Sequence, residues 1–224
     1  MTVFMCISFG QSARILVAAP SGTKSHKNAF VPLAKELVKR GHDVTIITNY
    51  ATAEFQQLEG MNEIVLSKLA VDLAGLPGVF QIARGNMTTS GTMELLKRLI
   101  YSSANVTTET FEDQRIADLL SNSHFDLVYA SLVCKYVSLP LARHFKAPII
   151  GFLPNVLIPG WAPVLGDSEH SEYVPFLMTS YTNRMNLHQR TINTLLYYIW
   201  PLFDMIIAAI TQPTVNKVTI KFMP

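Results

Sequence analysis

The sequence predicts an α/β fold, a Rossmann-like doubly wound parallel sheet, and two observations carry that prediction. Short apolar, β-branched runs alternate along the chain with longer segments whose apolar residues recur at helical spacing. The first run, Ile15–Pro20, is followed by a helical pattern over Phe30–Val38 and then by Asp43–Thr48, which is the order of a βαβ unit. Strands joined in this way are parallel, so repetition of the unit predicts a doubly wound sheet.

The helix of this first unit has recognisable ends. One apolar face is formed by Phe30, Leu33, Ala34, Leu37 and Val38. Pro32 suits the first helical turn, where its missing N–H costs nothing, and Gly41 suits the C-cap. The β-branched run Asp43–Thr48 then predicts the second strand.

Later segments continue the alternation of strands and helices. The expected elements are a strand in NEIVLSKL (62–69), helical stretches within Gly91–Ser121, a strand at Phe125–Ala130, a helical segment at Val133–Phe145 and a strand at Ala147–Leu153. Pro154–Pro175 is rich in Pro and Gly and predicts a long loop, and Tyr181–Ile210 predicts a helix. Long ordered loops in compact domains are often functional.

Composition limits the classes of protein. The chain has 224 residues, 49% of them hydrophobic and 15% charged, which suffices for the core of one large domain or, at the limit, of two small ones. A net charge of +2 without a basic run gives no electrostatic surface for nucleic acid. No histidine or cysteine pair has zinc-ligand spacing, so no metal site is expected.

The N-terminal residues predict secretion. Residues 1–12 are uncharged and mostly apolar, and small residues at Gly10 and Ser12 predict a signal peptide cut before Ala13, leaving a domain over 13–224. The alternative is a buried first strand. The sequons at Asn86 and Asn105 fit a secreted chain. Cys134 would then be the single cysteine, with no intrachain disulfide.

A membrane span is disfavoured within the chain. The one candidate, Thr194–Ile210, is short for a bilayer and is interrupted by Pro201 and Asp204. We therefore expect a helix packed on the domain surface that is kinked or broken at Pro201.

His26 stands where a ligand would bind. In open α/β sheets ligands lie beyond the carboxyl ends of the strands, and the loop Ser21–His26 leaves the first strand at that edge. A histidine near a helix start can equally be a capping or solvated residue. The Gly-rich signatures of phosphate and dinucleotide loops are absent from this loop, which argues against a nucleotide cradle here.

Three ordered stretches resemble one family. RILVAAPSGTKSHKNAFVPLAKELVKRGHDVTIIT, FDLVYASLVCKYVSLPLARHFKAPIIGF, and WAPVLGDSEHSEYVPFLMTSYTNRMNLHQRTINTL with its Tyr-Val-Pro and Arg-Met words resemble the UDP-glycosyltransferase family, animal membrane-bound branch. The match covers nearly the whole chain but only the family's N-terminal half. It implies the N-terminal, acceptor-binding domain of a GT-B type glycosyltransferase, whose second Rossmann-like domain binds UDP-sugar and ends in a membrane anchor.

The resemblance implies roles for particular residues. His26 stands at the family's general base, and Ser131 stands where the family places the acidic partner of that base. A hydroxyl can orient an imidazole but cannot offset its developing positive charge. Lys24, Val133 and Asn155 are expected to contact the acceptor. The resemblance also implies the lumenal side of the endoplasmic reticulum.

Three functions remain open from the sequence. The leading one is the acceptor-binding half of an inverting transferase that moves a sugar from UDP-sugar to a hydroxyl of a small lipophilic acceptor, with no cofactor held by this chain. The second is a non-catalytic remnant that binds a hydrophobic ligand or a partner. The third is an unrelated flavodoxin-like domain. The sequence leaves homo-oligomerisation open.

Overall fold

A parallel sheet forms the centre of the molecule. The computed structural model describes residues 12–67, 89–154, 159–164, 166–176 and 179–222, and within them lies a five-stranded sheet in the order β3-β2-β1-β4-β5. Its strands are β1 (Arg14–Ala19), β2 (Asp43–Thr48), β3 (Met61–Val65), β4 (Leu127–Ser131) and β5 (Ile149–Phe152). Each pairing is parallel. The predicted Rossmann-like α/β sheet is confirmed.

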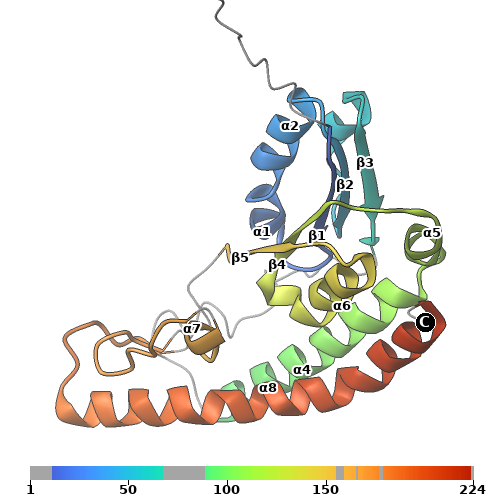
Figure 1. Cartoon of the computed structure of the whole chain (residues 1–224). Helices are drawn as coiled ribbons and strands as arrows, with labels where there is room; N and C mark the ends of the chain where they lie inside the picture. The colour runs from blue at the N-terminus through green and yellow to red at the C-terminus, as the bar shows by residue number, and fades with distance from the viewer. Residues whose placement is uncertain (1–11, 68–88, 155–158, 165, 177–178, 223–224) are drawn as a thin grey trace, which may run out of the picture.

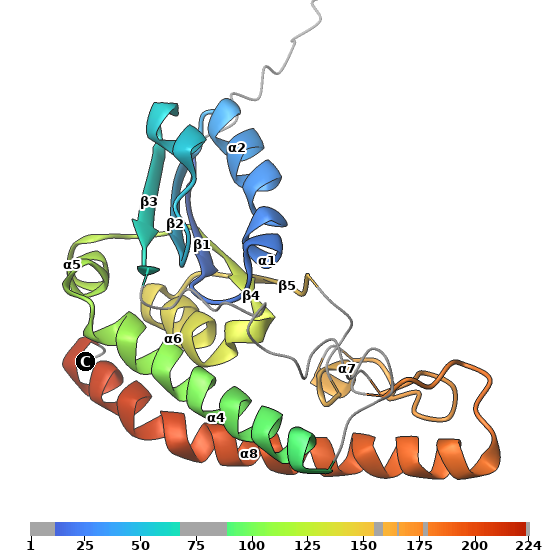
Figure 2. The same cartoon turned by 180° about the vertical axis from the view of Figure 1, so that it is seen from behind.

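Helices cover both faces of the sheet (Figures 1 and 2). They are α1 (Lys24–Asn28), α2 (Val31–Lys39), α4 (Thr89–Glu112), α5 (Gln114–Asn122), α6 (Lys135–Phe145), α7 (Trp161–Val164) and α8 (Leu187–Phe222), with 3₁₀ turns η1 (Ala53–Gln57) and η4 (Leu132–Cys134). In Figure 1, α1 and α2 lie on one side of the sheet, whereas α5 and α6 lie on the other. This two-sided cover is what makes the fold doubly wound.

Alternate residues of β1 serve the two faces. Ile15 and Val17 pack with Phe30 on the α2 side, whereas Leu16 and Ala18 belong to the core shared with α5 and α6. Successive side chains of a strand point to opposite faces, so a strand covered on both sides is apolar throughout. That is why Ile15–Pro20 reads as an uninterrupted apolar run.

The ends of the first helical segment follow local backbone chemistry. Pro32 lies in the first turn of α2, and Gly41 follows its C-terminus with φ of 84°, as predicted. The positive φ is the left-handed conformation that favours glycine. The separate short helix α1, which precedes α2, was not predicted, because its residues carry no apolar periodicity.

The predicted helix at Tyr181–Ile210 starts later and runs further. α8 begins at Leu187, where Asn186 Oδ1 accepts from Gln189 N at 2.9 Å and Gln189 Oε1 accepts from Asn186 N at 3.0 Å, a reciprocal capping box. The helix then continues through Pro201 as one element, so of the two expected forms, kinked or broken, the break is wrong. A proline removes one backbone hydrogen bond without ending the helix here, and α8 packs against α4 and α6.

α8 presents apolar side chains to the outside. It lies beside α4 along the lower edge of the molecule (Figures 1 and 2). An outward row of large apolar residues is exposed by more than 40%, namely Leu195, Tyr198, Ile199, Leu202, Met205, Ile206 and Ile210. Leu187–Lys217 is long and apolar enough to cross a membrane, and only 6% of its most apolar stretch is buried. Length and composition alone do not separate a span from a surface helix.

Candidate functional site

The loop after β1 delivers His26 to the carboxyl edge of the sheet. His26 lies in α1, whose N-cap Thr23 accepts from the His26 backbone N–H at 3.4 Å. Gly22 has φ of 122°, and a Cβ built there would lie 2.8 Å from His26 Cβ. Only glycine allows the chain to turn this closely beneath the imidazole.

The His26 ring has a hydroxyl partner. Thr23 Oγ1 lies 2.8 Å from His26 Nδ1 and 2.6 Å from Ser25 Oγ. When Nδ1 carries the proton it donates to Thr23, and Nε2 then keeps its lone pair. Among the described residues no side chain bonds Nε2. Partial burial lowers the pKa of His26, because desolvation disfavours the imidazolium. The ring is therefore neutral near pH 7 and able to accept a proton.

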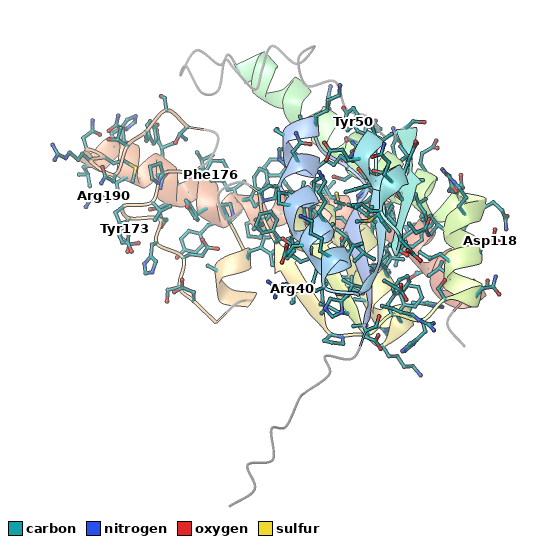
Figure 3. All side chains as sticks on the ribbon, turned by 90° about the horizontal axis from the view of Figure 1, so that it is seen from above. Arg40, Tyr50, Asp118, Tyr173, Phe176 and Arg190 are labelled. Carbon is teal, nitrogen blue, oxygen red and sulfur yellow. The ribbon has the colours of Figure 1, made fainter. Side chains whose placement is uncertain are left out.

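The loop is tied down from β2 and β3. Asn49 Nδ2 donates to the Gly22 carbonyl at 2.7 Å. Lys27, the one buried residue of α1, donates to the Tyr50 carbonyl and lies 3.4 Å from Glu63 Oε1. In Figure 3 the label of Tyr50 stands next to the cyan part of the ribbon, at the end of the sheet formed by β2 and β3. The position of His26 thus depends on elements that follow it in the chain.

Ser131 closes β4 at the same edge. The residue is 2% exposed, and its carbonyl accepts from Ser138 Oγ at 3.1 Å. Three residues beyond β4, the Cys134 thiol donates to the Ser21 carbonyl, with Sγ 3.9 Å from the oxygen. The ends of β1 and β4 therefore meet through Cys134, while the imidazole bonds Thr23 instead of Ser131. Burial raises the pKa of Cys134 to about 11, so this thiol is no nucleophile.

Two of the three other residues expected at the site border the same edge of the sheet. Lys24 is exposed at the start of α1, with Nζ 5.7 Å from the centre of the Tyr50 ring. Val133 is 38% exposed in η4, directly beyond the end of β4. Asn155 lies outside the described residues. Lys24 and Val133 thus border the carboxyl edge, on the β1 and β4 sides.

One of the two predicted glycosylation sequons lies among the described residues. Asn86 lies outside the described residues. Asn105 is exposed within α4, but the Thr107 of its sequon is 1% exposed and donates to the Ser103 carbonyl at 2.9 Å. The enzyme that attaches N-glycans could therefore reach this sequon only before α4 folds. No group of three potential metal-binding side chains occurs within the described part of the chain.

Sequence reasoning missed Thr23, Asn49 and the Lys27–Glu63 pair. Thr23 could have been found, because a Thr three residues before His26 in a helix-starting segment is an N-cap pattern. The contacts of Asn49, Lys27 and Glu63 carry no such local signal, since they join residues far apart in the chain.

A partly buried histidine with a lowered pKa lies on a loop at the carboxyl edge of the parallel sheet, the edge where open α/β domains bind their ligands. The family is set by sequence: a family model described as UDP-glucoronosyl and UDP-glucosyl transferase matches residues 13–221. The chain belongs to this UDP-glycosyltransferase family, which confirms the resemblance noted from its motifs.

Individual relatives agree with the family match. UDP-glycosyltransferase UGT4 of Dactylopius coccus is 28% identical over 193 residues, which cover 85% of this chain and 36% of that protein. UDP-glucuronosyltransferase 1A8 of Rattus norvegicus is 24% identical over 208 residues, 87% of this chain and 37% of that protein. The chain therefore spans little more than a third of these relatives.

Solved glycosyltransferase structures overlap with the fold in part. The calicheamicin glycosyltransferase CalG4 is 14% identical, with a TM-score of 0.46 over 85% of this chain and 43% of that one. The glycotransferase of kitacinnamycin is 17% identical, with a TM-score of 0.44 over 70% and 35%. The family assignment rests on the sequence match.

Proposed function

We propose that this chain is the acceptor-binding half of an inverting UDP-glycosyltransferase of GT-B type, with His26 as general base. The supporting observation is the 2.8 Å contact between His26 Nδ1 and Thr23 Oγ1: with Nδ1 as the donor, Nε2 is the proton acceptor. Nε2 takes the proton of an acceptor hydroxyl. The acceptor oxygen then bonds the anomeric carbon as the bond to UDP breaks, with inversion, and UDP leaves with the electron pair.

The substrates follow from the same proposal. The acceptor is a small lipophilic molecule with a hydroxyl group, bound at the carboxyl edge near Lys24 and Val133. UDP-sugar is held by a second domain beyond the residues of this chain, and no cofactor is needed. Calorimetric titration of the 224-residue chain with UDP-glucose or UDP-glucuronate should therefore show no saturable binding. Micromolar binding would place the nucleotide site within this chain.

Mutation of His26 tests the mechanism. In this chain joined to a UDP-sugar-binding half, His26→Ala should lower turnover about 10²–10⁴-fold, the usual contribution of a general base, with little change in acceptor binding. Thr23→Val, which removes the Nδ1 partner, should also lower turnover, whereas Thr23→Ser keeps the hydroxyl and should not. Unchanged turnover in His26→Ala would remove His26 from the mechanism.

One observation favours the second function, a non-catalytic remnant. Ser131 replaces the acidic partner that the resemblance implies, and the hydroxyl that contacts His26 Nδ1 is that of Thr23. Acceptor binding without turnover, unaffected by His26→Ala, would support the remnant.

We also propose that residues 1–12 are a signal peptide and that the chain resides on the lumenal side of the endoplasmic reticulum. Expression in a eukaryotic secretory host should give a glycosidase-sensitive mass shift at Asn86, Asn105 or both. Since Thr107 is buried, glycan at Asn105 requires addition before α4 folds. An unglycosylated cytosolic product would contradict this assignment.

A further inference from the structure

The helix that carries His26 is held by a charged residue. α1 has five residues, Lys-Ser-His-Lys-Asn, and none of them is apolar. Only Lys27 is buried, at 5% exposure. So short a helix has no stability of its own in water. Its place in the fold therefore depends on its caps and on what the Lys27 side chain contacts.

The Lys27 ammonium reaches the far side of the loop beyond β2. It donates to the Tyr50 carbonyl, lies 3.4 Å from Glu63 Oε1 of β3, and lies 5.9 Å from the centre of the Phe55 ring. Glu63 Oε2 in turn accepts from Thr52 N at 3.0 Å. The Lys27 and Glu63 side chains are 4% and 11% exposed. This network joins α1 to the β2–β3 connection and to β3.

A buried ion pair has a directional role that an apolar contact lacks. Burying a charge is costly unless it is paired and hydrogen-bonded, and such pairs rarely add net stability. Their geometry, however, fixes the orientation of the elements that they join. Desolvation lowers the pKa of Lys27, and the charge of Glu63 opposes that shift. The pair therefore keeps an otherwise unfavourable buried cation charged and in one place.

Lys27 and His26 are neighbours on α1, so they leave the helix about 100° apart. Lys27 points towards the β2–β3 connection, while His26 turns back to Thr23 at the start of the helix. Any rotation of α1 about its axis would move the imidazole along the sheet edge. The bond from Asn49 to the Gly22 carbonyl fixes the preceding loop but not this rotation.

We propose that Lys27 and Glu63 are positioning residues for His26, and that their buried ion pair sets the orientation of the imidazole at the carboxyl edge of the sheet. The inference rests on the proposed function for its catalytic meaning. The positioning itself is a property of this chain and is measurable without turnover.

The test uses Lys27→Met and Glu63→Gln in the 224-residue chain. Hydrogen exchange at the amides of position 27, Ala29 and Phe30, which close the turns of α1, should become at least about tenfold faster in both variants. Exchange at the β1 amides should not change, which shows that the sheet is intact. If Lys27→Met does not fold, the nearly isosteric Glu63→Gln decides alone.

The His26 titration separates positioning from a direct charge effect. If α1 loosens, the imidazole becomes more hydrated, and its pKa, now lowered by burial, should rise towards about 6.5 in both variants. A charge effect alone would raise the pKa in Lys27→Met, which removes a cation, and lower it in Glu63→Gln, which removes an anion. Shifts of opposite sign, measured by NMR, would overturn the proposal.

A matched pair on the next helix is the control. Lys35 of α2 pairs with Glu54 of η1, but the Glu54 side chain is 69% exposed. Lys35→Met and Glu54→Gln should change neither the exchange of α1 nor the His26 titration. Equal effects from both pairs would also overturn the proposal. Unchanged turnover in His26→Ala would overturn the proposed function. It would not overturn the positioning of His26, because hydrogen exchange and the His26 titration are measured without turnover.

Discussion

α1 and α8 treat charge and apolar surface in opposite ways. α1 has no apolar side chain, and the side chain that it buries is Lys27, which lies against Glu63 and the Tyr50 carbonyl. α8 exposes a row of apolar side chains, while its Asp204 turns inward to Lys135 and to Tyr136 Oη at 3.0 Å. In both helices a charged side chain lies on the inward face. Hydropathy alone therefore does not tell which side of either helix faces the protein.

The largest effect expected for a polar contact tests the inward face of α8. Asn193 is fully buried: its Oδ1 accepts from Phe176 N at 2.6 Å, and its Nδ2 donates to the carbonyls of Ser171 and Val174. Figure 3 shows Phe176 beside the first half of α8. Asn193→Ala leaves these groups unpaired and should destabilise the 171–176 segment by about 2–4 kcal/mol, measured by urea unfolding and limited proteolysis.

The control for Asn193 is the same substitution on the exposed side of the helix. Asn216 is exposed and accepts from Gln212 Nε2 at 2.7 Å. Asn216→Ala should change stability by about 0.5 kcal/mol or less. Equal losses in the two variants would show that burial is not what makes Asn193 important.

The next largest effect is expected from a carboxylate placed at the end of β4, on the edge of the sheet where α1 lies. Ser131→Asp places a carboxylate at the end of β4 and should raise the pKa of His26, which burial now lowers. In the two-half transferase, turnover should rise about ten- to a hundredfold, from a charge-assisted bond of about 1.5–3 kcal/mol. The rate, which increases with pH through the His26 pKa, should have its midpoint moved to higher pH.

Ser131→Asn is the uncharged control and should shift neither the titration nor the midpoint. A folded Ser131→Asp protein with an unchanged His26 titration would show that Ser131 is not the vacant half of a dyad. The thermal midpoint, measured alongside, reports the cost of burying the new carboxylate beside Cys134.

Two glycines test how closely the loop fits His26. Gly22 and Gly41 both have positive φ, but a Cβ at Gly22 would lie 2.8 Å from His26 Cβ, whereas one at Gly41 meets nothing within 4 Å. Gly41→Ala should cost about 1 kcal/mol of backbone strain, and Gly22→Ala about 2–3 kcal/mol because of the added clash. Urea unfolding measures both. Equal costs would mean that α1 yields easily around His26.

The smallest stability effect is expected on the outward row of α8. Leu202→Ser with Ile206→Ser should change the free energy of unfolding by about 0.5 kcal/mol or less, because both side chains are about half exposed. Self-association in sedimentation velocity should decrease, since large exposed apolar rows promote it. Leu141→Ser on α6, at a fully buried position, should instead cost several kcal/mol, about 2–5. A large loss from the α8 pair would show that the row packs within this chain.

The sequence by itself determined the order of strands and helices and placed His26 at the carboxyl edge of β1. These features depend on residues close in the chain: the uninterrupted apolar run of β1, the periodicity of α2 and the turn at Gly41. Local signals of this kind survive without knowledge of the fold. The capping box at Asn186 and the cap at Thr23 were not predicted, although each joins residues only three apart in the chain and has a local sequence pattern.

Only the tertiary structure decided which polar groups meet. The pairing of β2 with β3 brings Glu63 beneath Lys27, and the loop after β2 brings Asn49 to Gly22. The packing of α8 along α6 brings Asp204 to Lys135, and α8 runs through Pro201 as one helix. Each of these contacts joins residues distant in the chain, so it depends on strand register and helix packing, which hydropathy and spacing do not encode.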